Sequence, residues 1–234
     1  MSAQLRSRLN GRWVDADTII LNPAIGVHIF FPPDDYAHIH VIGGKDHNGF
    51  NTGVFFLRVH EWSVAMLSHT LAYPLIHPDV DLTISADQYA MNLVCNETEF
   101  RSNVLYQPRP WFNTYEFVRG YEGQKGDLLV HFPGLAADRS KHMTDWLDIV
   151  EADPTAWEVP LDQTAYQLKL DEFWTALRRG RDLLLAAGLN TSAAESTGPM
   201  QAVEHLKTVL EVQTDHLDVV NQAIEALTIA LRTG

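Results

Sequence analysis

The sequence predicts a mixed α/β fold that continues into an all-helical region at the carboxyl end. Short β-rich stretches alternate with helical patterns as far as Phe132, and only helical patterns follow. The chain has 234 residues, of which 46% are hydrophobic, so it can bury a sizeable core. We therefore expect one domain, or one domain with an appendage.

Apolar periodicity and turn residues predict the individual elements. Strands are expected at 13–22, 25–31, 38–42, 54–59, 104–106 and 127–132, and a loop rich in Gly and Asn at 43–53. Helices are expected at 61–73, ended by Pro74, and at 85–94, with Ser85 as candidate N-cap. Further helices are expected at 139–151, 161–188 and 203–232.

We expect four segments along the chain. They are an N-terminal segment 1–12, a main region 13–188, a linker 189–202 and a C-terminal helix 203–234. The linker follows from the Ser, Thr, Ala and Gly that dominate 190–199. The apolar stripe of the last helix fits packing on its own domain and binding of a protein partner equally well.

Charge, cysteine content and the lengths of the apolar stretches argue against several classes of protein. The formal net charge of −13 argues against a nucleic-acid partner or an anionic membrane surface. Cys95 is the only cysteine, so an internal disulfide is impossible. No stretch reaches the roughly 18 apolar residues of a membrane span. Residues 1–12 also lack the apolar core of a signal peptide.

Two carboxylates, Asp15 and Asp17, follow the apolar start at Trp13 and precede an Asn-Pro turn. In an extended segment residues i and i+2 point to the same side, so the two acids lie together. Such oxygen ligands bind Mg²⁺ or Mn²⁺, which usually complete their shell with substrate phosphates. The alternative is a strand end with two solvated acids.

Three further groups are candidates for a site. Asn51 lies in the glycine-rich loop, where the backbone can approach a ligand, although a plain hairpin loop explains the pattern too. Asp87 and Gln88 start a helix, where N–H groups can meet a polar ligand; the alternative is a capping acid. His131 lies at the end of an expected strand, where it is either a ligand for Mn²⁺ or a structural histidine.

In this order the segments resemble glycosyltransferase family 34. That family includes fungal Golgi galactosyltransferases and mannosyltransferases, and plant xyloglucan xylosyltransferases. The resemblance covers roughly residues 13–175. The matching stretches are 13–17, 22–23, 49–58, 62–63, 87–88, 112–115, 126–127 and 131–134.

The resemblance implies a partial GT-A type, Rossmann-like fold. It also implies a retaining transfer of galactose or mannose from UDP-galactose or GDP-mannose to a glycan acceptor. It assigns Mn²⁺ (or Mg²⁺) to Asp15, Asp17 and His131. The remaining assignments are Asn51 and Gly53 near the donor sugar, Asn113 and Gly134 in the pocket, and Asp87 and Gln88 at the reaction centre. There Asp87 would act as nucleophile or stabilising charge, and Gln88 would orient a substrate.

The chain departs from the family at its amino end. Only twelve residues precede Trp13, and they do not have the pattern of a buried parallel strand. The nucleoside-binding half and the membrane anchor of the family are therefore expected to be absent, and donor binding to be weak. The resemblance places the protein at the Golgi membrane. The alternatives are a non-catalytic truncated homologue, a structural subunit of a glycosyltransferase complex and, more remotely, an unrelated metal-dependent hydrolase.

Overall fold

The computed structural model describes residues 10–83, 85–190 and 197–233. A four-stranded sheet in the order β1-β4-β3-β5 lies at its centre. Its strands are β1 (Asn10–Val14), β3 (Val41–Asp46), β4 (Gly49–Arg58) and β5 (Val104–Tyr106). Of these pairs, β3–β5 is parallel and the other two are antiparallel. The predicted strand 104–106 is thus confirmed.

Two small sheets and six α-helices complete the described part of the chain. Strand β2 (Thr18–Ile20) pairs with β8 (Leu129–His131), and β6 (Glu116–Phe117) pairs with β7 (Gly120–Tyr121). The helices are α2 (Glu61–Ile76), α3 (Ala86–Asn96), α4 (Arg139–Ala152), α5 (Tyr166–Asn190), α6 (Thr197–Val212) and α7 (Leu217–Thr233). Seven short 3₁₀ turns lie between them: Val27–Phe30, Asp34–Tyr36, Arg101–Asn103, Arg109–Trp111, Ala136–Asp138, Pro154–Ala156 and Leu161–Gln163.

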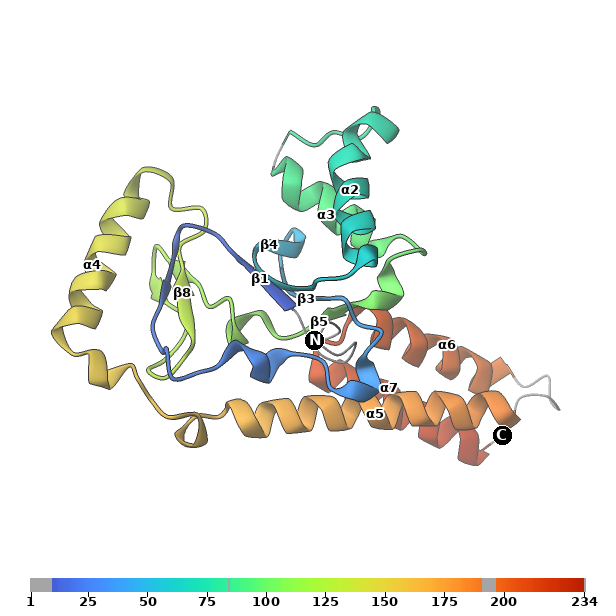
Figure 1. Cartoon of the computed structure of the whole chain (residues 1–234). Helices are drawn as coiled ribbons and strands as arrows, with labels where there is room; N and C mark the ends of the chain where they lie inside the picture. The colour runs from blue at the N-terminus through green and yellow to red at the C-terminus, as the bar shows by residue number, and fades with distance from the viewer. Residues whose placement is uncertain (1–9, 84, 191–196, 234) are drawn as a thin grey trace, which may run out of the picture.

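Helices cover both faces of the central sheet (Figure 1). Side chains alternate along each strand, so successive residues enter different cores. In β3, Val41 joins the core under α2 and α3, whereas Ile42 joins the core shared with α5, α6 and α7. In β5, Val104 and Leu105 divide in the same way. The continuous apolar runs of these strands therefore reflect burial on two sides.

A third core lies apart from the central sheet and holds α4 against β8. Val130 and Phe132 belong to it, together with the indoles of Trp146 and Trp157, whose ring centroids are 5.3 Å apart in an edge-to-face arrangement. This core fixes the strand that ends at His131. Helix α4 corresponds to the predicted helix 139–151.

The amino-terminal prediction is partly wrong. The expected strand 13–22 is divided into β1 and β2, which belong to different sheets, by the segment that holds Asp15 and Asp17. The expected strand 25–31 is instead a 3₁₀ turn, Val27–Phe30, whose N–H groups bond within the segment. Phe30 is the buried residue of this turn, and its ring packs on Phe56 at a centroid distance of 5.8 Å.

The expected loop 43–53 is largely a hairpin of two strands. Strand β3 starts at Val41 and includes Gly43 and Gly44, and β4 starts as early as Gly49. A Cβ on Gly43 would lie 2.4 Å from the Phe50 ring, and one on Gly44 would lie 2.8 Å from the backbone of Arg109. These two glycines therefore allow close packing inside a strand.

Pro74 does not end its helix, contrary to the prediction. Helix α2 continues to Ile76 and is capped at His77, whose N–H donates to the Tyr73 carbonyl at 2.8 Å. A proline so near a helix end costs only one backbone hydrogen bond. Ser85 does precede α3, but it has a left-handed backbone (φ 53°) and its side chain makes no capping hydrogen bond.

The expected single helix 203–232 is two helices. Thr214 lies in the turn between α6 and α7, where its buried hydroxyl donates to the Tyr106 carbonyl at 2.6 Å and accepts from the Tyr106 N–H at 3.2 Å. The apolar stripe of α7 is buried within the chain, against α5 and α6. Residues 197–202 of the expected linker are helical, and 191–196 lie outside the described residues.

The predicted helix 161–188 becomes a 3₁₀ turn, Leu161–Gln163, followed by α5. The expected strand 127–132 shortens to the three residues of β8. In the ranges that the structure describes, no helix combines the length and the apolar character needed to cross a membrane.

Candidate functional site

Asp15, Asp17 and His131 meet at the junction between the central sheet and the β2–β8 pair. Asp15 directly follows β1, and its N–H donates to the Gly53 carbonyl at 2.8 Å. Asp17 directly precedes β2, whose Thr18 is paired with His131. One ligand atom from each of the three side chains lies within 4.8 Å of the others. Two predicted metal ligands near the amino end and a third more than a hundred positions later are thus brought together.

Asp17 makes ion-pair contacts with two side chains. Its Oδ1 lies 3.4 Å from His131 Nε2, and its Oδ2 lies 3.0 Å from Nε of Arg139, the first residue of α4. Asp15 Oδ1 accepts from the indole N–H of Trp13 at 3.0 Å. The Arg139 guanidinium therefore balances part of the negative charge that two adjacent carboxylates create.

A buried hydrogen-bond relay leads from His131 into the fold. Its Nδ1 lies 2.8 Å from Asn113 Oδ1, and Asn113 Nδ2 donates to Asn51 Oδ1 at 2.7 Å. Asn51 Nδ2 then donates to Asp46 Oδ2 at 2.8 Å and to Gln88 Oε1 at 3.2 Å. Gln88 Nε2 closes the relay on the Asp46 carboxylate at 3.3 Å. Three other predicted site residues are thus linked to the metal cluster.

The relay ends on one group that can only accept hydrogen bonds and includes a contact with one that can only donate. These two groups fix the direction of every hydrogen bond in the relay. The Asp46 carboxylate can only accept, and the backbone N–H of Gly53, which lies 2.9 Å from Asn51 Oδ1, can only donate. The oxygen of Asn51 therefore faces Asn113, and the oxygen of Asn113 faces His131. The neutral imidazole then carries its proton on Nδ1, and the lone pair of Nε2 points to the carboxylates.

Burial also disfavours the charged form of this imidazole. Desolvation lowers the pKa of His131 below its ordinary 6.5, although the neighbouring Asp17 and Asp15 oppose the shift. At neutral pH the Nε2 atom is therefore free of a proton and can ligate a cation.

The donor set fits Mn²⁺ or Mg²⁺ well. Two carboxylates and one imidazole satisfy an ion that prefers oxygen and tolerates nitrogen, and three protein ligands leave coordination positions for phosphate oxygens or water. The tautomer that the relay imposes on His131 is the one that a ligand at Nε2 requires.

The glycines and Asp87 complete the predicted set. A Cβ on Gly53 would lie 2.3 Å from His131 Cε1, so only glycine lets the ring take its position. Gly134 is exposed with a φ of 71°, and open space surrounds the place of its missing Cβ. Asp87 is exposed in the first turn of α3, whereas its neighbour Gln88 is buried in the relay. The structure therefore joins seven of the nine predicted residues, and it does not join Asp87 or Gly134 to them.

Sequence reasoning missed Asp46 and Arg139. Asp46 lies in an Asp-His-Asn-Gly turn, where its Oδ1 also accepts from the Asn48 N–H at 2.7 Å. The hydrogen bond within the turn is enough to explain an acid at this position, so the sequence gives no sign that it also takes part in the relay. Arg139 starts a helix eight positions after His131, and no sequence spacing links it to Asp17.

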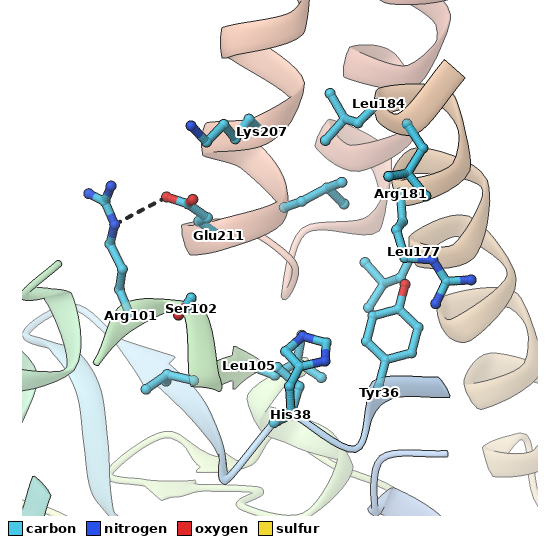
Figure 2. A pocket seen from close by; sticks show the side chains of 14 residues that line it. Tyr36, His38, Arg101, Ser102, Leu105, Leu177, Arg181, Leu184, Lys207 and Glu211 are labelled. Atoms are coloured by element: carbon cyan, nitrogen blue, oxygen red, sulfur yellow. Dashed lines mark ion pairs between the residues drawn. The ribbon is translucent and has the colours of Figure 1, made fainter. Parts of the chain in front are cut away.

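Two cavities lie at opposite ends of β3. A cavity of about 300 Å³ adjoins the relay and is lined by Asn48, Asp81, Thr83, Ser85, Gln88 and Tyr89. A larger one of about 370 Å³ lies between α5, α6 and the residues that precede β3 and β5 (Figure 2). There the side chains of Tyr36 and His38 face Leu177, and Arg101 pairs with Glu211 at 3.3 Å. The lining of the larger cavity includes no residue of the relay and none of Asp15, Asp17 and His131.

Comparison with known proteins gives one match. Residues 31–142 match the sequence profile described as the galactosyl transferase GMA12/MNN10 family. The matched range contains the relay and His131, whereas Asp15 and Asp17 lie before it. No curated protein and no solved structure matches the chain.

Proposed function

Because residues 31–142 belong to the galactosyl transferase GMA12/MNN10 family, we propose that this chain is a retaining hexosyltransferase that uses Mn²⁺ and a nucleotide sugar. Galactose or mannose would be transferred from UDP-galactose or GDP-mannose to a glycan acceptor at the Golgi membrane. The observation that carries the proposal is the convergence of Asp15, Asp17 and His131 within 4.8 Å. Family membership alone supports glycosyl transfer in general.

The cation is assigned to the diphosphate of the donor. A bound Mn²⁺ would supply positive charge that stabilises the nucleoside diphosphate as it leaves. Asp15 and Asp17 would hold it through oxygen, and His131 through Nε2. Asn113 would keep that nitrogen free by accepting the proton of Nδ1. The guanidinium of Arg139, whose Nε lies 3.0 Å from Asp17 Oδ2, would add a second positive charge beside the phosphates.

The sugar is assigned to the cavity that Gln88 lines. Its volume of about 300 Å³ is large enough for a hexose, and each residue that lines it carries a side chain with a polar group. Gln88 is held by Asn51 and Asp46, so its amide is well positioned to orient a hydroxyl. Retention requires attack from the side of departure, or a carboxylate nucleophile on the other side. We keep Asp87 as the candidate for that carboxylate.

One observation favours the rival function, a non-catalytic homologue that serves as a structural subunit. Asp87 is exposed and lies outside the relay, so the expected reacting carboxylate stands apart from the candidate metal ligands. Such a subunit would bind Mn²⁺ without transferring a sugar. Both functions therefore predict Mn²⁺ binding, and only the transferase predicts turnover of a nucleotide sugar.

Metal binding and turnover of the full chain test the proposal. Mn²⁺ affinity would be measured by electron paramagnetic resonance, and release of nucleotide from UDP-galactose and GDP-mannose would be followed with a mannose oligosaccharide as acceptor. We expect Asp17→Asn to abolish both, whereas the exposed Asp145→Asn should leave both unchanged.

Each outcome has a separate meaning. Turnover that depends on Mn²⁺ and survives in Asp145→Asn supports the transferase. Loss of turnover with retained Mn²⁺ affinity in Asp87→Asn supports the role of that carboxylate. Mn²⁺ binding without any turnover favours the structural subunit, and wild-type Mn²⁺ affinity in Asp17→Asn contradicts the metal site itself.

A further inference from the structure

A second group of metal-ligating side chains lies on α2 and α3, away from the candidate site. His69 belongs to the middle of α2, His77 is the residue that caps its end, and Glu97 caps the end of α3. One ligand atom from each of the three lies within 4.8 Å of the others. The two helices pack side by side over the central sheet (Figure 1). None of these residues takes part in the relay or in the Asp15, Asp17 and His131 cluster.

The nearest pair already has the spacing of two ligands on one ion. His69 Nε2 lies 3.4 Å from Glu97 Oε2. Two ligands at about 2.0–2.1 Å from a tetrahedral Zn²⁺ are separated by about 3.3 Å, so this pair would need almost no movement. The His69 Nε2 atom is buried and makes no hydrogen bond in the described structure. A nitrogen that is buried and without a hydrogen bond is uncommon, and a metal ion would satisfy it.

The third ligand is held on the same side by its neighbours. The ring of His77 packs on Tyr73 with a centroid distance of 4.3 Å, and Tyr73 is buried one turn after His69. His77 has a non-helical backbone (φ −124°, ψ 66°), so helical geometry does not determine the direction of its side chain. Phe100 supports the other imidazole, with a centroid distance of 5.5 Å to His69.

The electrostatics of both helices favour a cation at this place. His77 and Glu97 stand at helix carboxyl ends, which carry partial negative charge. Neither α2 nor α3 has a basic residue in its last turn to balance that charge. A bound divalent ion would balance it.

We propose that His69, His77 and Glu97 form a zinc site that joins α2 to α3. Two imidazoles and one carboxylate suit Zn²⁺, whereas the two carboxylates and one imidazole of the other cluster suit Mn²⁺. A water molecule would occupy the fourth position. Helix α3 carries Gln88, so the ion would also hold in place the helix that contributes to the relay.

The two sites are separated by matched variants of the full chain. Zn²⁺ alone would be titrated into wild-type protein, His77→Gln and Glu97→Gln, with binding followed by calorimetry and by the melting temperature. Both side chains lie at helix ends, so either variant is expected to fold. The controls are Asp17→Asn, which removes the other cluster, and His47→Gln, which removes an exposed histidine.

We expect Zn²⁺ to raise the melting temperature of wild type, Asp17→Asn and His47→Gln, because an ion that binds only the folded state stabilises it. In His77→Gln and Glu97→Gln the affinity should fall by more than the roughly 10- to 100-fold that accompanies loss of an outer-shell partner. Co²⁺ should give the visible absorption of a four-coordinate ion in wild type and not in these two variants.

Two results would overturn the proposal. One is equal Zn²⁺ affinity in wild type, His77→Gln and Glu97→Gln. The other is loss of Zn²⁺ binding in Asp17→Asn alone, which would assign the ion to the Asp15, Asp17 and His131 cluster. Neither readout depends on sugar transfer, so failure of the proposed enzymatic function would leave this test intact.

Discussion

The backbone of Gly53 lies directly against the edge of the His131 imidazole. A Cβ on Gly53 would come within 2.3 Å of His131 Cε1 and 3.0 Å of Asn51 Oδ1. Both contacts involve the relay that fixes the imidazole, so a glycine in the middle of β4 determines where the candidate ligand on β8 lies. The position of the ring is therefore set by contacts on two sides.

Gly53→Ala should displace the imidazole and weaken Mn²⁺ binding. We expect a loss of about 1–3 kcal/mol in the free energy of unfolding, as for other overpacked core positions. Urea unfolding measures the first effect and electron paramagnetic resonance of Mn²⁺ the second. Gly11→Ala, in the paired strand β1, is the control, because its Cβ would meet only the Leu57 carbonyl at 3.7 Å. Unchanged Mn²⁺ affinity in Gly53→Ala would contradict the close contact.

Asn113→Leu should weaken Mn²⁺ binding without removing a ligand. The change deletes the acceptor that holds the proton of His131 on Nδ1, so Nε2 would lose its fixed lone pair. Loss of such an outer-shell partner typically costs roughly 10- to 100-fold in metal affinity. Asn103→Ala, which removes a surface hydrogen bond to the His38 carbonyl, should have no effect on Mn²⁺. Equal affinities in the two variants would show that the relay does not act on the metal site.

His40 should make the fold less stable in acid. Burial, together with His60, Arg58 and His38 nearby, lowers the pKa of His40 from 6.5 to about 4. The unfolded chain binds a proton at about pH 6.5 and the native state does not, so stability falls as pH decreases from about 6.5 to about 4. Above that window the imidazole is neutral in both states and contributes no pH dependence.

His40→Phe should remove this part of the pH dependence. The ring of residue 40 stacks on His60 and Trp62, with centroid distances of 4.4 and 5.1 Å, and phenylalanine can keep both contacts. Melting temperatures at about pH 7.5 and about pH 5 would be compared by circular dichroism. The drop should be smaller in His40→Phe than in wild type. An equal drop would assign the acid sensitivity to other groups.

Thr214→Val should loosen the carboxyl-terminal helices. The buried hydroxyl makes two hydrogen bonds to the backbone of Tyr106, and valine would leave both Tyr106 groups unpaired at a cost of roughly 1–3 kcal/mol. Urea unfolding measures the loss. Thr208→Val on α6, which removes only a bond to the Glu204 carbonyl within the same helix, is the control. Equal stability of the two variants would argue against a tie between α6–α7 and β5.

The sequence predicted the type of most elements and misjudged several boundaries. Helical patterns in the sequence located α2, α3 and α4, although only α3 has a continuous buried side, whereas α2 exposes Leu71 and Leu75. Hydrophobic periodicity could not distinguish the 3₁₀ turn Val27–Phe30 from a strand, since both show a short apolar run. It also joined α6 to α7, because the deciding contact is between Thr214 and Tyr106, more than a hundred positions apart.

The candidate site was predictable where residue types carry the chemistry. Two acids two positions apart suggested a cation, the resemblance to glycosyltransferase family 34 added His131, and the structure brings all three together. Asp46 and Arg139 were not predictable, because their roles depend on which side chains face them after folding. Helix spacing alone also could not show that Gln88 points into the relay while Asp87 is exposed.

The segment between β1 and β2 passes from one sheet to another, and it carries Asp15 and Asp17 on the way. A cation held there together with His131 would cross-link the two sheets, because each side of the ion would belong to a different one. Separation of the sheets would then require release of the ion. Loading with metal should accordingly slow amide hydrogen exchange in β1, β2 and β8 together, and local opening of this junction would set how fast the ion departs.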